Sequence, residues 1–464
     1  MAELASLNRG SKRKHHAHGG KDRTKTFSKN KKKTNRGKYN DNDSIASTDE
    51  EFAEENNKFQ AEESGTEEEE ETAQEKKLRI AKKYLEEIEA KEKDLAEFEE
   101  GAVARRLREE YLEEKGWLRK TVASKYTGHE DLITLRCKEH RDSITCICLS
   151  SNGQILYSGS KNGAVVKWSL EQRKKLNSIK TKRKAEAAAK DNLKCIQCIA
   201  ISTDNKFLVV GDAKLREIKI FCGNTLSHLK NLPGHRACVT GLVFRKDTHT
   251  LYSASEDRSV KVWNLDDMAY VETLFGHQSG ITSIDALSRE RAITSGGFDG
   301  SVRIWKIVEE SQLIFNGHGG SIDAVKLINE ENFLSCGDDG NLSVWSSIKK
   351  KPLCRVAEAH GRDETNMQPM WISSIATFLN TDLVASGSRN GEIKLWKCDD
   401  SFRSLHPLFV VKLTGFINAL AFTPDGKSLI AGVGQQHRLG NWWRIPDAKN
   451  SIVIIPLIMT NVAK

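Results

Sequence analysis

The residue types that serine hydrolases use for catalysis recur along this chain from about residue 140 onwards. His, Ser and Asp can together activate a hydroxyl nucleophile, and here each set is followed by a Trp. In every set, Ser precedes Asp by four residues and Asp precedes Trp by six. The complete sets are His235, Ser253, Asp257 and Trp263; His277, Ser295, Asp299 and Trp305; and His318, Ser335, Asp339 and Trp345. Two further sets, which begin at His140 and His360, have Asn162 and Asn390 in place of Asp.

This repetition favours a structural role over catalysis. Buried polar groups that satisfy one another can tie a loop to a strand in every repeat, so we expect buried structural tetrads. A metal site is not indicated, because Cys195 and Cys198 lack a second pair and His15, His16 and His18 lack further ligands nearby. No nucleotide loop or nucleophile motif appears either. We therefore expect no enzymatic activity, no cofactor and no small-molecule substrate.

Short strands surround these sets and must position them. The dipeptides Gly234-His235, Gly276-His277, Gly317-His318 and Ala359-His360 follow one another at intervals of 42, 41 and 42 residues. Alternating apolar residues, as in 259–263 and 301–305, predict strands, and Asp-Gly or Asn-Gly pairs predict the turns before them. A period of this length indicates a repeat architecture in which each unit forms one small sheet.

The pattern resembles that of WD repeats, in which each unit makes one four-stranded blade of a β-propeller. Two degenerate units, one from Cys195 to Phe221 and one from Gly415 to Trp442-Trp443, bring the total to seven. The fold class predicted is an all-β, seven-bladed WD-repeat β-propeller over residues 133–464. Either 133–137 or 451–457 can supply the outer strand that closes the ring, and we favour the N-terminal candidate because it precedes His140 as outer strands precede the other Gly-His loops.

Charge divides the N-terminal region into two tails. Residues 1–40 have a net charge of +11 and residues 41–120 a net charge of −13, whereas the rest of the chain carries +10. Blocks of like charge repel themselves, so we expect a basic disordered tail at 1–40 and an acidic one at 41–75. The basic clusters predict a nuclear-import signal, with a nonspecific polyanion-binding tail as the alternative: Lys12, Arg13, Lys14, Lys31, Lys32 and Lys33. Ser47 and Thr48 precede carboxylates and are candidate phosphorylation sites.

Two further segments stand out from the repeats. Helix-forming residues at 76–120, interrupted at Gly101, predict a helical segment before the propeller that either is solvated or docks on a partner. An insertion at 171–194 forms a basic arm, which is either a solvated loop or a phosphate-contacting element; its candidate contacts are Lys174, Lys175, Lys182, Arg183 and Lys184. No apolar run approaches the length of a membrane span, and the scattered cysteines indicate reduced thiols.

The last unit resembles the family of U3 small nucleolar RNA-interacting WD-repeat proteins. The resemblance is carried by residues 431–444 (AGVGQQHRLGNWWR), by 448–451 and 454–457, and by 103–123 before the propeller. It implies a non-catalytic, nucleolar RNA-binding scaffold of the U3 small nucleolar ribonucleoprotein (snoRNP). Such a scaffold binds the box B/C region of U3 snoRNA beside the kink-turn-binding protein and other box C/D core proteins, and acts with the small-subunit processome in pre-ribosomal RNA processing.

From this resemblance we take the following as candidate contacts for RNA or a partner: Gln435, His437, Arg438, Trp442, Trp443 and Arg444. Blade packing is the alternative role, and we expect it for Trp442 more than for Arg438, because a guanidinium with five donors is seldom buried without a partner. A competing function is that of a nuclear WD-repeat adaptor, either a ubiquitin-ligase substrate receptor or a chromatin adaptor, that binds peptides at the central opening of the propeller.

Overall fold

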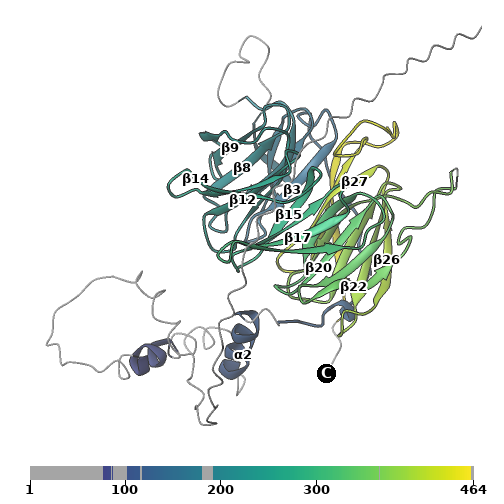
Figure 1. Cartoon of the computed structure of the whole chain (residues 1–464). Coiled ribbons are helices and arrows are strands. Elements are labelled where there is room, and N and C mark those ends of the chain that lie inside the picture. Colours follow the sequence, from purple (N-terminus) through teal and green to yellow (C-terminus); the bar gives the residue numbers. More distant parts are fainter. Residues whose placement is uncertain are drawn as a thin grey trace, which may run out of the picture. The chain divides into compact units, whose positions relative to one another are not determined.

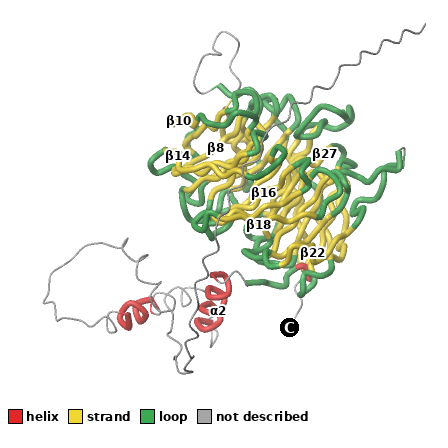
Figure 2. Tube along the Cα trace, in the orientation of Figure 1, coloured by secondary structure: helices red, strands yellow, loops and turns green. Residues whose placement is uncertain are grey.

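Seven antiparallel sheets form the blades of the computed structural model: six have four strands, and the seventh has five (Figures 1 and 2). The structure describes residues 77–84, 86, 102–114, 118–179, 192–364 and 366–460. Each blade pairs its strands in chain order from the inside outwards, apart from the last. The innermost strand of every blade packs against that of the next, and the seventh packs against the first, so the ring is closed. The predicted seven-bladed WD-repeat propeller is confirmed.

The first six blades are contiguous in sequence. Blade one contains β3 (Ile144–Leu149), β4 (Ile155–Ser160), β5 (Val165–Ser169) and β6 (Lys174–Ile179), and blade two contains β7 (Ile196–Ile201), β8 (Phe207–Asp212), β9 (Glu217–Cys222) and β10 (His228–Leu232). Blade three contains β11 (Val239–Phe244), β12 (Thr250–Ser255), β13 (Ser259–Asn264) and β14 (Ala269–Phe275), and blade four contains β15 (Ile281–Ala286), β16 (Arg291–Gly296), β17 (Ser301–Lys306) and β18 (Ser311–Asn316). Blade five contains β19 (Ile322–Leu327), β20 (Asn332–Gly337), β21 (Leu342–Ser346) and β22 (Lys349–Val356), and blade six contains β23 (Ile372–Thr377), β24 (Leu383–Ser388), β25 (Glu392–Cys398) and β26 (Leu405–Lys412).

The seventh blade joins the two ends of the repeat region. Its inner strands are β27 (Phe416–Phe422), β28 (Ser428–Gly434) and β29 (Ser451–Met459), and both β1 (Tyr126–His129) and β2 (Ile133–Leu135) pair with β29. The outer edge is therefore N-terminal, as we favoured, while the C-terminal candidate is the third strand. Because β1 already pairs with β29, the propeller begins at Tyr126 rather than at residue 133.

Apolar side chains fill the spaces between blades. In blade five, the Trp345 ring stacks on Phe333 at a centroid distance of 6.0 Å and meets Phe315 of blade four edge-on at 6.1 Å. Such contacts around the ring bury the alternating apolar residues that predicted the strands. All ten cysteines are free thiols.

A segment before the propeller is fastened to blade six. Helix α2 (Ala102–Glu114) lies in the predicted helical region, as do residues 77–84. After it, the Arg119 guanidinium donates to the carbonyl oxygen of Cys398 at 2.9 Å and stacks on Phe402. The backbone N–H groups of Val122 and Ala123 both donate to Oδ1 of Asp382, at 2.7 and 2.9 Å. We call residues 118–126, which include the short 3₁₀ turn η1 (Ala123–Lys125), the strap.

The blade topology separates the loops into two faces. Loops from the second strand to the third, and from each fourth strand to the next blade, form what we call the upper face. Loops from the first strand to the second, and from the third to the fourth, form the lower face. The lower-face loops contain 14 acidic residues and 7 Lys or Arg residues, whereas the described upper-face loops contain 11 acidic residues and 14 Lys or Arg residues. Polyanions are therefore attracted more to the upper face. Within the described residues, no helix has the length and apolar content that a bilayer span requires.

Candidate nucleic-acid interface

The His, Ser, Asp and Trp sets form buried hydrogen-bonded groups. In blade three, His235 contacts Ser253 Oγ through Nε2 at 2.8 Å and Asp257 through Nδ1 at 2.9 Å, and the indole N–H of Trp263 donates to the same Oγ at 2.8 Å. Blade five repeats the arrangement with His318, Ser335, Asp339 and Trp345. Each Ser Oγ is engaged by two partners and lies away from solvent, so the groups have the geometry of structural ties.

The prediction for blade four is wrong in one residue. His277 and Trp305 both contact Thr294 Oγ1 at 2.8 Å, while Ser295 Oγ pairs with Thr282. Strand pairing explains the difference. In blade three, the hydroxyl residue lies opposite the residue two positions before Trp, and in blade four Thr294 takes that place opposite Arg303. A longer turn before Asp299 shifts the register by one residue.

The two sets with Asn are incomplete. His140 and His360 contact Ser158 and Ser386 through Nε2, but their Nδ1 atoms are buried and have no hydrogen-bond partner among the described residues. Burial lowers the pKa of His140 to about 4 and that of His360 to about 3, so both rings are neutral at pH 7. In blade three, burial raises the pKa of Asp257, but the hydrogen bonds from His235, Ser259 and the Arg236 backbone together outweigh it, and the pKa ends well below its usual value.

The last unit differs from the expected blade in its third strand. Trp442-Trp443 does not end a strand: it lies in the connection between β28 and β29, over residues 435–450, which we call the upper loop. The loop folds back on itself, since Gln436 and Arg444 form a bridge and Ile445 N–H donates to the Gln435 carbonyl. The Gln435 side chain donates to the carbonyl oxygen of Ala448 at 2.8 Å, so its amide group is engaged in a hydrogen bond within the upper loop.

Arg438 points from the upper loop into the central channel. Its guanidinium donates to the Asp323 carbonyl on β19, and its own carbonyl accepts from Gln197 on β7 at 3.1 Å. Its backbone N–H donates to the Asn418 side chain on β27 at 3.0 Å. Inner strands of three blades thus converge on one residue, and the chain itself occupies the upper mouth of the channel.

A polar and aromatic layer supports this arrangement. Trp371 donates through its indole N–H to the Asp323 carboxylate, and the buried His437 ring lies 4.1 Å from the Trp371 ring. Burial lowers the pKa of His437 well below its usual value, so this ring packs as a neutral group. Burial also raises the pKa of Asp323, to about 7, against the opposing effects of Arg438 and Trp371. Sequence reasoning missed Trp371 and Asp323, because neither belongs to a repeated motif.

Three of the six candidates of the last unit face solvent. Trp442 is 63% exposed and Trp443 is 43% exposed, and Arg444 is exposed as well. Gln435, His437 and Arg438 are turned inward. Our expectation that packing suits Trp442 better than Arg438 is therefore wrong, because the Asp323 carbonyl accepts a hydrogen bond from the inward-facing Arg438 guanidinium.

The basic arm is described only at its ends. Lys174 and Lys175 belong to β6, the outer strand of blade one, and Lys175 forms an ion pair with Glu139 at 2.5 Å that lowers the carboxyl pKa. Lys182, Arg183 and Lys184 lie outside the described residues, as do the candidate import and phosphorylation positions. The arm therefore begins in the lower-face turn before β6, and its remaining part, which joins β6 to β7, leaves and rejoins the blades on the upper face.

The upper face offers further cations that sequence reasoning did not single out. Lys214, Arg216, Arg236 and Arg258 are exposed, come from blades two and three, and form no ion pair with described residues. They are joined on this face by Arg444. Unpaired guanidinium and ammonium groups can neutralise phosphates. The signal that could have found them is their position in the loops that carry the tetrads.

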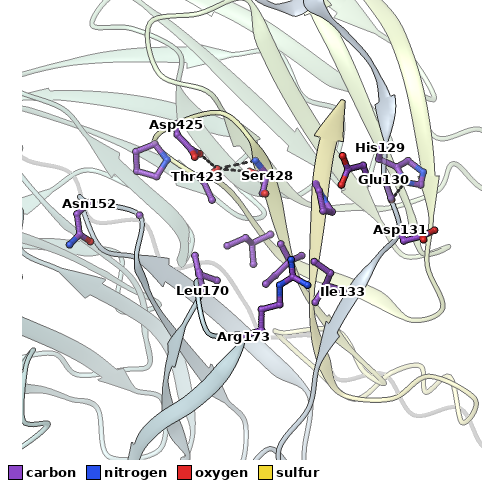
Figure 3. A pocket seen from close by; sticks show the side chains of 15 residues that line it. His129, Glu130, Asp131, Ile133, Asn152, Leu170, Arg173, Thr423, Asp425 and Ser428 are labelled. Atoms are coloured by element: carbon purple, nitrogen blue, oxygen red, sulfur yellow. Dashed lines mark hydrogen bonds between the residues drawn. The ribbon is translucent and has the colours of Figure 1, made fainter. Parts of the chain in front are cut away.

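A cavity of about 850 Å³ lies at the seam between blades one and seven, away from the upper loop (Figure 3). Apolar residues such as Leu170, Ile430 and Ile454 line it, and the Arg173 side chain lies between Leu170 and Ile133 in Figure 3. Glu130, Asp131 and Asp425 add carboxylates to its rim. With three carboxylates and one guanidinium, the cavity carries an excess of negative charge that repels the phosphates of a nucleic acid. Across the part of the chain that is described, no three His, Cys, Asp or Glu side chains gather to hold a metal ion.

Known proteins share both the repeat and the whole propeller. Five segments match the family "WD domain, G-beta repeat": 129–169, 226–264, 268–306, 309–346 and 365–397. The chain is 51% identical over 390 residues to the human "U3 small nucleolar RNA-interacting protein 2". The aligned region covers 83% of this chain and 82% of the relative. The chain is 26% identical to "Ribosomal RNA-processing protein 9" of Saccharomyces cerevisiae, over 82% and 88% of the two chains. The solved "Structure of U3-55K" is 48% identical, covers 73% of this chain and all of its own, and superposes with a TM-score of 0.68.

Proposed function

Because the chain belongs to the family of U3 small nucleolar RNA-interacting WD-repeat proteins, we propose that it is a non-catalytic RNA-binding scaffold of the U3 snoRNP. In this role it binds the box B/C region of U3 snoRNA, with the kink-turn-binding protein alongside, and serves pre-ribosomal RNA processing in the nucleolus. The names of its relatives, one of which is a ribosomal RNA-processing protein, support the process.

One observation carries the assignment of the RNA-binding surface. The upper loop presents Trp442, Trp443 and Arg444 on the same face as the connection from β6 to β7, which belongs to the basic arm. Exposed aromatic rings and unpaired cations are the groups that bind single-stranded RNA, by stacking and by phosphate neutralisation. The lower face, with its excess of acidic residues, lacks this combination.

The alternative of a peptide adaptor has less support. Such an adaptor needs an open central channel, and Arg438 fills the upper mouth of this one through contacts with Asp323, Gln197 and Asn418. Catalysis by the His, Ser and Asp sets is equally unsupported, because their side chains are buried and engaged with one another in the described blades.

The test is RNA binding by the full chain as a function of salt. We expect the affinity for box B/C RNA to fall steeply with salt and to increase when the kink-turn-binding protein is present. Arg216→Glu and Arg236→Glu on the upper face should weaken binding, and each should reduce the salt slope by about one because it removes a cation that neutralises one phosphate. Arg403→Glu, in an exposed loop of the lower face, is the matched control and should leave both unchanged. Equal binding of unrelated RNAs, with no gain from the partner protein, would contradict the proposal.

A further inference from the structure

Trp442 is built into the upper loop as a supported, outward-facing ring. A Cβ atom placed on Gly440 would come within 2.7 Å of three atoms of the six-membered ring of Trp442. The Trp442 indole therefore lies directly against the backbone at Gly440. Trp371 and His437 lie behind it, with ring centroids at 5.9 and 6.1 Å and interplanar angles of 36° and 32°. The Trp residues of the tetrads are buried, whereas Trp442 leaves most of its surface to solvent.

The loop that carries Trp442 is fixed from several blades. Lys161, in the upper-face turn of blade one, donates to the Gly440 carbonyl at 2.8 Å and to the Asn441 side chain at 3.0 Å. Arg438 anchors the other side of the turn in the channel. An aromatic ring held in this way loses little conformational freedom when a second ring stacks on it.

The neighbouring Trp443 has a different environment. The Arg389 guanidinium lies 4.2 Å from its ring centroid, and Arg389 is itself paired with the Asp363 carboxylate. A cation thus already covers one side of Trp443, and Trp371 meets it edge-on. Of the two adjacent indoles, Trp442 leaves the larger part of its surface open to a ligand, 63% against 43% for Trp443.

We propose that Trp442 stacks on an unpaired base of the bound RNA, an inference that rests on the proposed function. Every nucleobase has an aromatic face, and bases that are not in a helix stack on exposed aromatic side chains. The exposed Arg444 and the cations of the upper face lie on the same side of the propeller, where they can hold the flanking phosphates. A hydrophobic peptide is the less suitable ligand, because the ring stands out from a face that carries an excess of cations.

The experiment compares the affinity of full-length variants for box B/C RNA across a range of salt concentrations. Trp442→Ala should weaken binding about 5- to 150-fold, the range expected when one base no longer stacks, without changing the salt slope. Trp442→Phe should retain most of the affinity, and Gly440→Ala, which displaces the indole without removing it, should resemble Trp442→Ala. Phe298→Ala is the matched control: this side chain is 87% exposed on the upper face of blade four, and its removal should have no effect. Thermal unfolding checks that each variant is folded.

A second set of RNAs identifies the stacked nucleotide. Each unpaired nucleotide of the box B/C RNA is replaced in turn by an abasic one. If the missing base is the one that stacks on Trp442, the wild type and Trp442→Ala should bind that RNA with equal affinity. An unchanged affinity of Trp442→Ala, or an equal loss with every abasic RNA, overturns the stacking. If Trp442→Ala instead abolishes binding of the kink-turn-binding protein without RNA, the ring is a protein contact and the inference is wrong. Failure of the wild-type chain to bind RNA would reject the proposed function itself.

Discussion

Each tetrad histidine is held through both ring nitrogens where its blade supplies an aspartate. His235, His277 and His318 have this second contact, whereas the Nδ1 atoms of His140 and His360 are buried without one in the described structure. An unsatisfied buried polar atom costs about 1 to 3 kcal/mol. The two Asn-containing blades are therefore the ones in which a single substitution can add a missing interaction.

We predict that Asn390→Asp stabilises blade six. The new carboxylate can accept from His360 Nδ1 as Asp257 does from His235, and one such hydrogen bond contributes about 1 kcal/mol. The measurement is the free energy of unfolding in urea at pH 7. Asn224→Asp, at an exposed position of blade two, is the control for the added charge. A destabilised Asn390→Asp protein would show that the turn cannot bring the carboxylate to the ring.

Asp323 makes stability depend on pH in the opposite sense to a salt-bridged carboxylate. Its pKa in the folded chain is about 7, above the value of about 3.9 for an unfolded Asp. Between these values the folded state binds the proton more tightly, so this residue's contribution to stability falls as pH rises towards 7 and is constant above it. We predict that Asp323→Asn gains stability relative to the wild type as pH increases from 5 to 7. Urea unfolding at several pH values measures the free energies of unfolding of the two proteins. A difference between them that does not change from pH 5 to pH 7 would contradict the prediction.

At the scale of elements, the features that recur from blade to blade, namely the strands and the tetrads, could be predicted from the sequence. The strands at 259–263 and 301–305 and the tetrads follow from offsets that every blade shares, because each blade must bury the same groups. Thr294 could not be predicted, since its role depends on a one-residue shift in strand pairing that no spacing reveals. The end of the last unit was placed at Trp442-Trp443, inside the upper loop, because this pair resembles the aromatic residue that ends the third strand of the other blades. The contact from Arg438 to Asp323 joins residues 115 positions apart in sequence and exists only once the blades have come together.

The strap is the element that connects the region of α2 to the propeller, and Asp382 is its main attachment. We predict that Asp382→Ala destabilises the full chain by about 1.5 to 3 kcal/mol, because Val122 and Ala123 lose a charged acceptor in a buried place. Asp400→Ala is the control: its carboxylate forms an exposed pair with Arg119 and should contribute less than about 1 kcal/mol. Chemical unfolding distinguishes them, and equal effects would contradict the special role of Asp382.

At the scale of the whole molecule, the propeller presents two faces of unlike charge, and the predicted import signal lies outside it in the sequence. We predict that residues 1–40 direct nuclear import and that the propeller folds without them, because its closing strands begin at Tyr126. A tagged chain that starts at residue 101 should unfold cooperatively yet accumulate in the cytoplasm. Alanine substitution of Lys12, Arg13, Lys14 and Lys31–Lys33 in the full chain should have the same effect. Continued nucleolar accumulation of both variants, with RNA binding abolished, would contradict the import signal.

The most direct test of the account is a crosslinking map of U3 snoRNA on the full chain in cells. Ultraviolet crosslinking followed by peptide mass spectrometry identifies the residues that touch RNA. We predict crosslinks in the upper loop at 440–444 and in the upper-face turns that carry Arg216 and Arg236, with none in the lower-face turns around Asp266 and Glu309. Crosslinks concentrated in the lower-face turns, with the upper loop unlabelled, would contradict the claim that this propeller binds U3 snoRNA through its upper face.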